Sequence, residues 1–150
     1  MKVLAIGDNA QNFAREIFPD AEVNTSTIQP GKKRTDYDSV MAYMCLQNVP
    51  YRDVTNTVKA WVDTLKQGGE LTIMVPSMEW AAIQVLSKDR SPALLAHLFG
   101  VDNKSMSGFT MMDLRAVCST AGVAITHAAT GEYSIGENVC ELHTVRGVKK

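Results

Sequence analysis

Apolar residues along the 150-residue chain occur either in short continuous runs or at helical spacing. Short runs closed by glycine or proline are typical of buried parallel strands, whereas apolar residues three and four positions apart form one face of a helix. The runs predict strands at residues 3–6, 21–25, 38–43, 71–75, 123–126 and 139–145. The helical spacing predicts helices over residues 10–17, 54–65, 78–86, 92–99 and 110–121.

Strands and helices therefore alternate along most of the chain. This alternation predicts an α/β fold in which helices cover a mostly parallel sheet, with an antiparallel pair of strands at the end. Only residues 29–36, a loop by composition, separate the second predicted strand from the third. They are too few for a further helix and strand, because a parallel crossover needs about a dozen residues or more. No repeat, low-complexity stretch or linker interrupts the chain, so we expect one domain over residues 1–150.

Local signals mark the ends of two predicted helices. Gly68 and Gly69 follow the second helix and would supply its left-handed stop. Thr110 and Asp113 have the spacing of a capping box, and Gly122 would end the helix that they open.

Composition narrows the function classes. The chain carries a formal net charge of -1 at pH 7, so no large surface would attract nucleic acid or an anionic membrane. No apolar run approaches the roughly 18 residues that cross a bilayer, and we expect neither a membrane span nor a signal peptide. These observations lead us to expect a cytoplasmic protein.

The spacing of the cysteines and histidines does not predict a metal site. The three cysteines are widely spaced and contain no CxxC pair, so neither a disulfide framework nor a zinc site is expected. His97, His127 and His143 lie in separate predicted elements without the spacing of metal ligands. We expect all three histidines to be structural.

Several stretches of the chain match one family, in the family's order. They are "VLAIG" at residues 3–7, "FPDAEV" at 18–23, "YDSVMAYMCLQNVPYRDV" at 37–54, "LKQGGELTIMVP" at 65–76, "HLFG" at 97–100 and "SGFTMMDLRAVCSTAGV" at 107–123. With these stretches the chain resembles the class I S-adenosylmethionine-dependent methyltransferases. The resemblance implies a Rossmann-like sheet that ends in a reversed hairpin and lacks the family's third strand. It also implies a ligand site at the carboxyl ends of the parallel strands, as in other open α/β sheets.

The resemblance implies S-adenosylmethionine as the cofactor. Tyr43 and Met44 would lie nearest its methyl group, with packing at a strand end as the alternative. The segments that would cover the pocket contain Met78 with Trp80, and Met106 with Met111 and Met112, with core filling as the alternative. The catalytic residues and the acceptor stay unassigned, and no metal is implied. The implied cofactor-binding residues are Gly7, Asp8, Asn9, Thr27, Ala42, Tyr43 and Met44.

The glycine-rich turn departs from the family's pattern D/E-x-G-x-G-x-G. In alignment the acid falls on Ala5, the first glycine on Gly7 and the next two on Asn9 and Gln11. Asn9 can preserve the turn because asparagine tolerates the left-handed region, whereas the Gln11 side chain would point toward the amino-acid half of the cofactor. Asp8 is expected to cap the following helix. We therefore expect a narrower pocket.

Two further positions replace charged or titratable groups by neutral ones. The carboxylate that would accept both ribose hydroxyls falls near Thr27, and no acid lies between Asn24 and Gln29. In "LQNVP", the amides Gln47 and Asn48 replace a common Glu-His pair, which removes acid–base capability. We therefore expect affinity for S-adenosylmethionine to be weak or absent.

The sequence leaves more than one interpretation open. In the first, the chain is a small methyltransferase with a reduced cofactor site and an unknown acceptor. In the second, it is a catalytically inactive scaffold that acts as a binding or assembly module for a protein partner. An unprotected sheet edge would then favour a homo-oligomer. In a third, the pocket breaks S-adenosylmethionine down, which no residue specifically favours.

Overall fold

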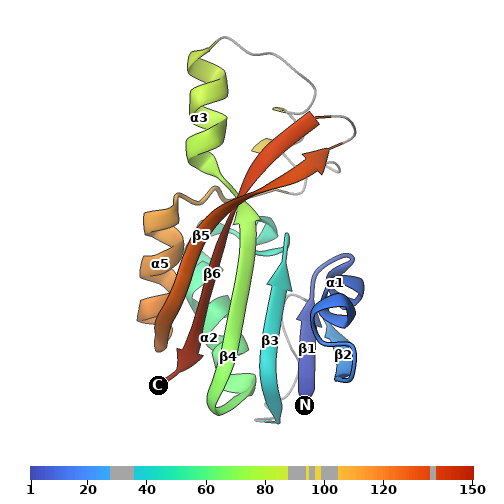
Figure 1. The fold of residues 1–150 in the computed structure, drawn as a ribbon. Helices are drawn as coiled ribbons and strands as arrows, with labels where there is room; N and C mark the ends of the chain where they lie inside the picture. Colours follow the sequence, from blue (N-terminus) through green and yellow to red (C-terminus); the bar gives the residue numbers. More distant parts are fainter. Residues whose placement is uncertain (28–35, 88–93, 95–96, 99–104, 136–137) are drawn as a thin grey trace.

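The computed structural model describes residues 1–27, 36–87, 94, 97–98, 105–135 and 138–150. Its centre is a six-stranded sheet with the strand order β2-β1-β3-β4-β6-β5 (Figure 1). Each strand contains or overlaps a predicted one, and β4, β5 and β6 extend well beyond the predicted runs. The strands are β1 (Lys2–Ile6), β2 (Glu22–Ser26), β3 (Tyr37–Tyr43), β4 (Leu65–Pro76), β5 (Val123–Ile135) and β6 (Asn138–Lys149).

The strand directions confirm the predicted fold class. Strands β1 to β4 pair in parallel, whereas β6 runs antiparallel to both β4 and β5. In the part of the chain that the structure describes, β2 has β1 as its only neighbour. The described sheet therefore lacks a strand outside β2, where the resemblance places the family's third strand.

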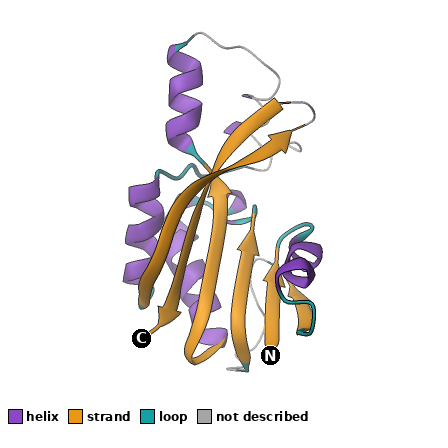
Figure 2. Cartoon of the chain, in the orientation of Figure 1, coloured by secondary structure: helices purple, strands orange, loops and turns teal. Residues whose placement is uncertain are grey.

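Helices cover both faces of this sheet (Figure 2). One helix, α1, packs on one face, and α2 and α5 pack on the other. Most of the predicted helix over residues 92–99 lies outside the described residues. The described helices are α1 (Ala10–Ile17), α2 (Val54–Thr64), α3 (Met78–Leu86) and α5 (Met111–Thr120), with short 3-10 helices η1 (Leu46–Asn48) and η2 (Tyr51–Asp53).

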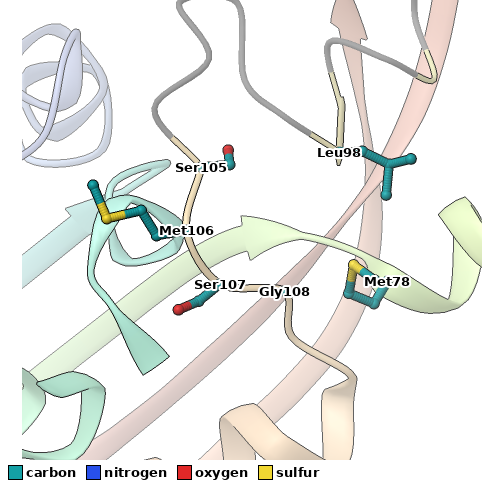
Figure 3. Close-up of a pocket in the computed structure, with 6 residues that line it drawn as sticks. All are labelled: Met78, Leu98, Ser105, Met106, Ser107 and Gly108. Carbon is teal, nitrogen blue, oxygen red and sulfur yellow. The ribbon is translucent and has the colours of Figure 1, made fainter. Parts of the chain in front are cut away.

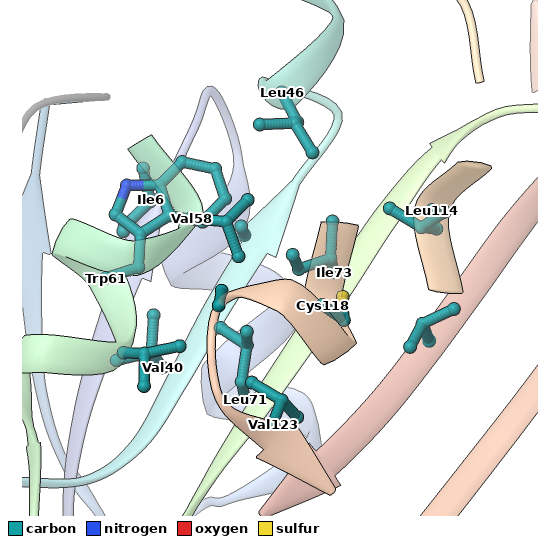
Figure 4. Close-up of a cluster of buried hydrophobic side chains, with 14 of the residues drawn as sticks. Ile6, Val40, Leu46, Val58, Trp61, Leu71, Ile73, Leu114, Cys118 and Val123 are labelled. Atoms are coloured by element: carbon teal, nitrogen blue, oxygen red, sulfur yellow. The ribbon is translucent and has the colours of Figure 1, made fainter. Parts of the chain in front are cut away.

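Side-chain alternation along the strands builds a core on each face. In β1, Leu4 and Ile6 join the larger core under α2 and α5, while Val3 and Ala5 join the smaller core under α1. Trp61 of α2 is fully buried in the larger core, beside the inward faces of β3, β4 and α5 (Figure 4). Burial of this apolar surface on both faces stabilises the sheet and the helices packed on it.

One predicted helix end is confirmed and one is wrong. The Thr110 hydroxyl accepts from the Asp113 N–H at 3.1 Å and the Asp113 carboxylate accepts from the Thr110 N–H at 3.2 Å, which completes the capping box of α5. Gly122 follows α5 with φ 90°, as expected of a left-handed stop. However, α2 ends at Thr64, and Gly68 (φ 73°) lies inside β4. It belongs to an irregularity of that strand, because the register between β3 and β4 shifts there.

The terminal hairpin extends past the sheet. β4 pairs with β6 only as far as Pro76 and Leu142, whereas β5 and β6 stay paired to Ile135 and Asn138. The outer half of the hairpin and α3 therefore rise beyond the carboxyl end of β4 (Figure 1). None of the described helices is long and apolar enough to cross a membrane.

Candidate functional site

The parallel register brings three predicted contact segments to one edge of the sheet. Ile6 of β1 is paired with Ser26 of β2 and with Ala42 of β3. The residues that directly follow Ile6, Ser26 and Ala42 form the next row, at the carboxyl ends of the three strands. We call this end of the sheet the carboxyl edge. The residues in that row are Gly7, Thr27 and Tyr43.

The turn after β1 requires glycine at its first position. Gly7 has φ 109°, and a Cβ placed on it would lie 2.2 Å from the carbonyl oxygen of Tyr43. A side chain would be strained by this φ and would also collide with the backbone of β3. The glycine therefore lets the β1–α1 turn lie directly against the end of β3.

Asp8 and Asn9, the residues after Gly7, differ in their relation to helix α1. Asn9 is the N-cap of α1 and has φ 64°, so the expectation that asparagine preserves the turn is confirmed. The expectation that Asp8 caps α1 is wrong, because Asn9 occupies the N-cap position and no side chain caps this helix. Asp8 is exposed instead. Burial, and to a smaller extent the charge of Asp8, raises the pKa of the Cys45 thiol to about 12. The Asp8 carboxylate therefore lies near Cys45, beside the turn.

The end of β3 combines packing with an unusual backbone. The half-buried Tyr43 ring stacks on Phe13 of α1 with 5.2 Å between ring centroids. Ala42, before it, is fully buried. Met44, after it, has φ 49°, a left-handed conformation that is uncommon for methionine, and its N–H donates to the Met74 carbonyl at 3.0 Å. The strand end is therefore held on both sides, by α1 and by β4.

The amide that replaces the family's acid ties the loop after β3 to a distant segment. The Gln47 side chain donates to the Met44 carbonyl at 2.8 Å. The backbone carbonyl of Gln47 accepts from the N–H groups of Met106 and Ser107, at 2.7 and 3.0 Å. The Ser107 hydroxyl donates to the Val49 carbonyl at 2.5 Å. The buried Gln47 Oε1 has no hydrogen-bond partner among the described residues.

A cavity of about 250 Å³ is lined in part by Met106 and Ser107, the residues that bond to Gln47 (Figure 3). Of the residues that the sequence placed over the pocket, Met78 and Met106 line this cavity, whereas Trp80, Met111 and Met112 do not. Sequence spacing carries no signal for the other lining residues, because Leu98 and residues 105–108 meet Met78 only in the folded chain. The full lining is Met78, Leu98, Ser105, Met106, Ser107 and Gly108.

Neither family position for a carboxylate carries one in the described residues. Ala5, at the first position, is 1% exposed in the core under α1. Thr27, at the second, is exposed and is the last residue described before residues 28–35. Glu22 begins β2, at the opposite end of that strand from the carboxyl edge. The described residues thus place a threonine, and no carboxylate, at the end of β2.

The histidines form no metal site within the described residues. His97 and His143 are each 3% exposed. His143 Nε2 lies 2.5 Å from the Glu79 carboxylate, and His97 Nδ1 lies 2.8 Å from the Tyr133 hydroxyl. The sequence did not predict these pairs, because 64 and 36 residues separate their members.

Comparison with known proteins gives similarity of structure alone. No family model and no curated protein sequence matches the chain. Its structure is similar to that of a methyltransferase-family protein from Bacillus halodurans, with a TM-score of 0.71, 12% identity and coverage of 99% of this chain and 91% of that one. An S-adenosylmethionine-dependent methyltransferase from Methanosarcina mazei has a TM-score of 0.63 at 14% identity, with 99% and 81% of the two chains covered.

A third similar structure was determined with ligands. It is 1,6-didemethyltoxoflavin-N1-methyltransferase from Burkholderia thailandensis with bound 1,6-didemethyltoxoflavin and S-adenosylhomocysteine. Its TM-score is 0.61 at 11% identity, and the match covers 98% of this chain and 60% of that one. These likenesses agree with the strand order and confirm the fold that the resemblance implied.

Proposed function

We propose that this chain, which has the fold of the class I S-adenosylmethionine-dependent methyltransferases, binds S-adenosylmethionine at the carboxyl edge through a reduced set of contacts. In this proposal it transfers the methyl group to a separate acceptor. The observation that carries the proposal is the row of Gly7, Thr27 and Tyr43, with Gly7 held at φ 109° against β3. The solved relative with bound S-adenosylhomocysteine agrees with a nucleoside ligand for this fold.

The residues present fit part of the cofactor. The glycine turn lies directly against the end of β3, at the edge where open α/β sheets bind their ligands. The Thr27 hydroxyl would bond one ribose oxygen, more weakly than a carboxylate bonds two. The exposed Asp8 carboxylate lies beside this turn and would attract the positive charges of the sulfonium and amino groups. Methyl transfer itself asks the protein mainly for alignment and exclusion of water.

Titration calorimetry with S-adenosylmethionine and with S-adenosylhomocysteine tests the proposal. We expect saturable binding of both, in the micromolar range or weaker. The absence of heat and of thermal stabilisation at millimolar ligand would contradict cofactor binding and favour the scaffold interpretation.

A double variant tests the position of the ligand. Gln11→Gly with Thr27→Asp restores two family residues, and we expect it to bind S-adenosylmethionine about tenfold more tightly because a carboxylate would accept both ribose hydroxyls. Gln11→Gly with Thr27→Asn is the matched control, which changes the same positions without adding charge. Equal affinities of both variants and the wild type would mean that the ribose lies elsewhere.

The second candidate function is a binding or assembly module. It is favoured by the absence of both family carboxylates from the described residues and by the outer edge of β2, which no described strand covers. Such an edge offers unpaired backbone groups to another chain. Sedimentation equilibrium would show concentration-dependent self-association under this candidate, and a monomer that binds the cofactor would contradict it.

A further inference from the structure

Met44, the residue after β3, is held in a left-handed conformation by a hydrogen bond on each of its sides. Its φ is 49°, in a region that residues with a Cβ rarely adopt. Its N–H donates to the Met74 carbonyl of β4 at 3.0 Å, and its carbonyl accepts from the Gln47 side chain at 2.8 Å. Such a conformation costs free energy and persists only where surrounding contacts hold it. The Met44 backbone therefore depends on these two bonds.

The conformation of Met44 decides how the end of β3 meets its neighbours. The peptide group that joins Tyr43 to Met44 presents its oxygen to the turn after β1, 2.2 Å from the point where a Cβ on Gly7 would lie. The N–H of the same peptide group donates to Met74. The left-handed φ is the rotation that directly follows this peptide group, so a change of that φ would turn either the peptide group or the η1 loop away from its present contacts. The carboxyl edge therefore keeps its shape only while Met44 keeps its conformation.

Gln47 carries the chemical group that this arrangement needs. A carbonyl oxygen only accepts, so the NH2 group of Gln47 must face Met44, and an ionised glutamate could not make this bond. Gln47 is 8% exposed, and its Oε1 has no hydrogen-bond partner among the described residues. A buried acceptor without a partner costs free energy, which an apolar side chain would avoid. The bond to Met44 is thus the contact for which this position needs an amide.

Gln47 also holds the segment that lines the cavity. Its backbone carbonyl accepts from the N–H groups of Met106 and Ser107 at 2.7 and 3.0 Å. Both of these residues line the cavity (Figure 3). Gln47 is therefore bonded on one side to the end of β3 and on the other side to the cavity lining.

We propose that Gln47 is a positioning residue of the cofactor site: its amide holds the left-handed Met44 that shapes the carboxyl edge, and its carbonyl holds the cavity lining beside that edge. The inference rests on the proposed function. In the sequence, Gln47 stands where the family commonly has an acid, and its neutral side chain indicates a loss of acid–base capability. In the structure, the same amide makes a bond that an ionised acid could not make. Gln47 thus serves the shape of the site, and its neutrality is what this role requires.

Titration calorimetry with S-adenosylmethionine on Gln47→Met tests the inference. Methionine keeps the length of the side chain but lacks the donor, so Met44 should leave the left-handed region. The dissociation constant should then rise about tenfold, as the loss of one hydrogen bond allows. Asn48→Met is the matched control, because it makes the same change one residue further along η1 and leaves the Met44 bond in place; it should bind like the wild type. Wild-type affinity in Gln47→Met would overturn the inference.

Glycine at position 44 separates positioning from a general loss of stability. Glycine adopts a positive φ without support from a neighbour. In a Met44→Gly background, Gln47→Met should therefore change the affinity by no more than about twofold, and Met44→Gly alone is the reference because it also lacks the methionine side chain. An equal tenfold loss in both backgrounds would show that Gln47 acts in another way and would overturn the inference.

Restoring the family's acid should weaken the site. Gln47→Glu returns a carboxylate, but it removes the donor and brings a buried negative charge to the Met44 carbonyl. We therefore expect weaker binding of S-adenosylmethionine than in the wild type at pH 7. Tighter binding in Gln47→Glu would contradict the role of the amide.

A backbone measurement separates the inference from the proposed function. NMR of the ligand-free wild type should show a strong cross-peak between the amide and α hydrogens of Met44, because these hydrogens lie close together at a positive φ, and Gln47→Met should show a weaker one. A weak cross-peak in the wild type, or an unchanged one in Gln47→Met, would overturn the inference whether or not the cofactor binds. Failure of the wild type to bind S-adenosylmethionine would instead contradict the proposed function.

Discussion

At the scale of single residues, backbone geometry explains why the first turn kept one glycine and lost two. Gly7 is held at a φ that other residues avoid, and its missing side chain leaves room for the Tyr43 carbonyl. Asn9 occupies the left-handed region without glycine, because asparagine is the residue that tolerates it best after glycine. The turn therefore has left-handed or positive-φ backbone at Gly7 and Asn9, with glycine at only one of the two positions.

Gly7→Ala should destabilise the protein by at least about 2 kcal/mol, from the strain of a left-handed alanine and the collision with β3. Urea unfolding at pH 7 measures the difference. Gly131→Ala is the matched control, because a Cβ at Gly131 meets no atom within 4 Å, and its stability should stay within about 0.5 kcal/mol of the wild type. Equal stabilities of the two variants would contradict the strained turn.

At the scale of elements, capping and register decide where each helix and strand presents its residues. The capping box of α5 satisfies two backbone N–H groups, and the Met111 N–H in the same turn donates to the Glu79 carboxylate of α3 at 2.9 Å. The start of α5 is thus fixed both locally and by α3. This arrangement places Phe109, fully buried before the helix, beside Ser77 at the end of β4.

Thr110→Ala should cost about 1 kcal/mol of stability, because the Asp113 N–H loses its acceptor at a helix N-terminus. Thermal and urea unfolding would report the loss. Thr120→Ala, at an exposed position in the last turn of the same helix, is the control and should have little effect. A Thr110→Ala variant as stable as the wild type would show that the Glu79 contact alone holds the helix start.

At the scale of the whole molecule, one polar network links the terminal hairpin to α3 and α5. Glu79 of α3 accepts from His143 of β6 and from Met111 of α5, and His143 Nδ1 lies 3.0 Å from the Thr130 hydroxyl of β5. Burial alone would raise the pKa of Glu79, but its hydrogen bonds outweigh that effect and hold the pKa below the ordinary value. The ionised carboxylate therefore helps to keep the hairpin against α3 and α5.

This network predicts how stability changes in acid. Because the pKa of Glu79 is lowered on folding, its contribution is present above the unfolded value near 4.5 and is lost as the pH falls through the folded value. Glu79→Gln should therefore lose less stability than the wild type between pH 6 and pH 3, measured by urea unfolding. The effect should be modest, because the Glu79 side chain is 45% exposed. Glu16→Gln, at an exposed position on α1, is the control and should follow the wild type.

Patterns of a few residues predict most of the local structure of this chain. Apolar spacing located the strands and most helices, and the Thr110 signal located the start of α5, because these features depend on neighbours within a few residues. The family resemblance implied a site at the carboxyl ends of the parallel strands, and the register of the sheet brings Gly7, Thr27 and Tyr43 to that edge. Local signals failed at Asp8, because the neighbouring Asn9 takes the N-cap position of α1. They also failed at Gly68, because the pairing of β4 with β3 places this residue inside a strand.

Only the tertiary structure decided which distant side chains meet. The pairs His97–Tyr133 and Glu79–His143 join segments far apart in the chain, and their members carry no mutual spacing that a sequence pattern could reveal. They form because the hairpin outruns β4 and the chain after α3 returns beside it, which is a consequence of sheet register and length. The local pattern thus accounts for the scaffold and its carboxyl edge, whereas long-range packing brings together the His97–Tyr133 and Glu79–His143 pairs and the residues that line the cavity.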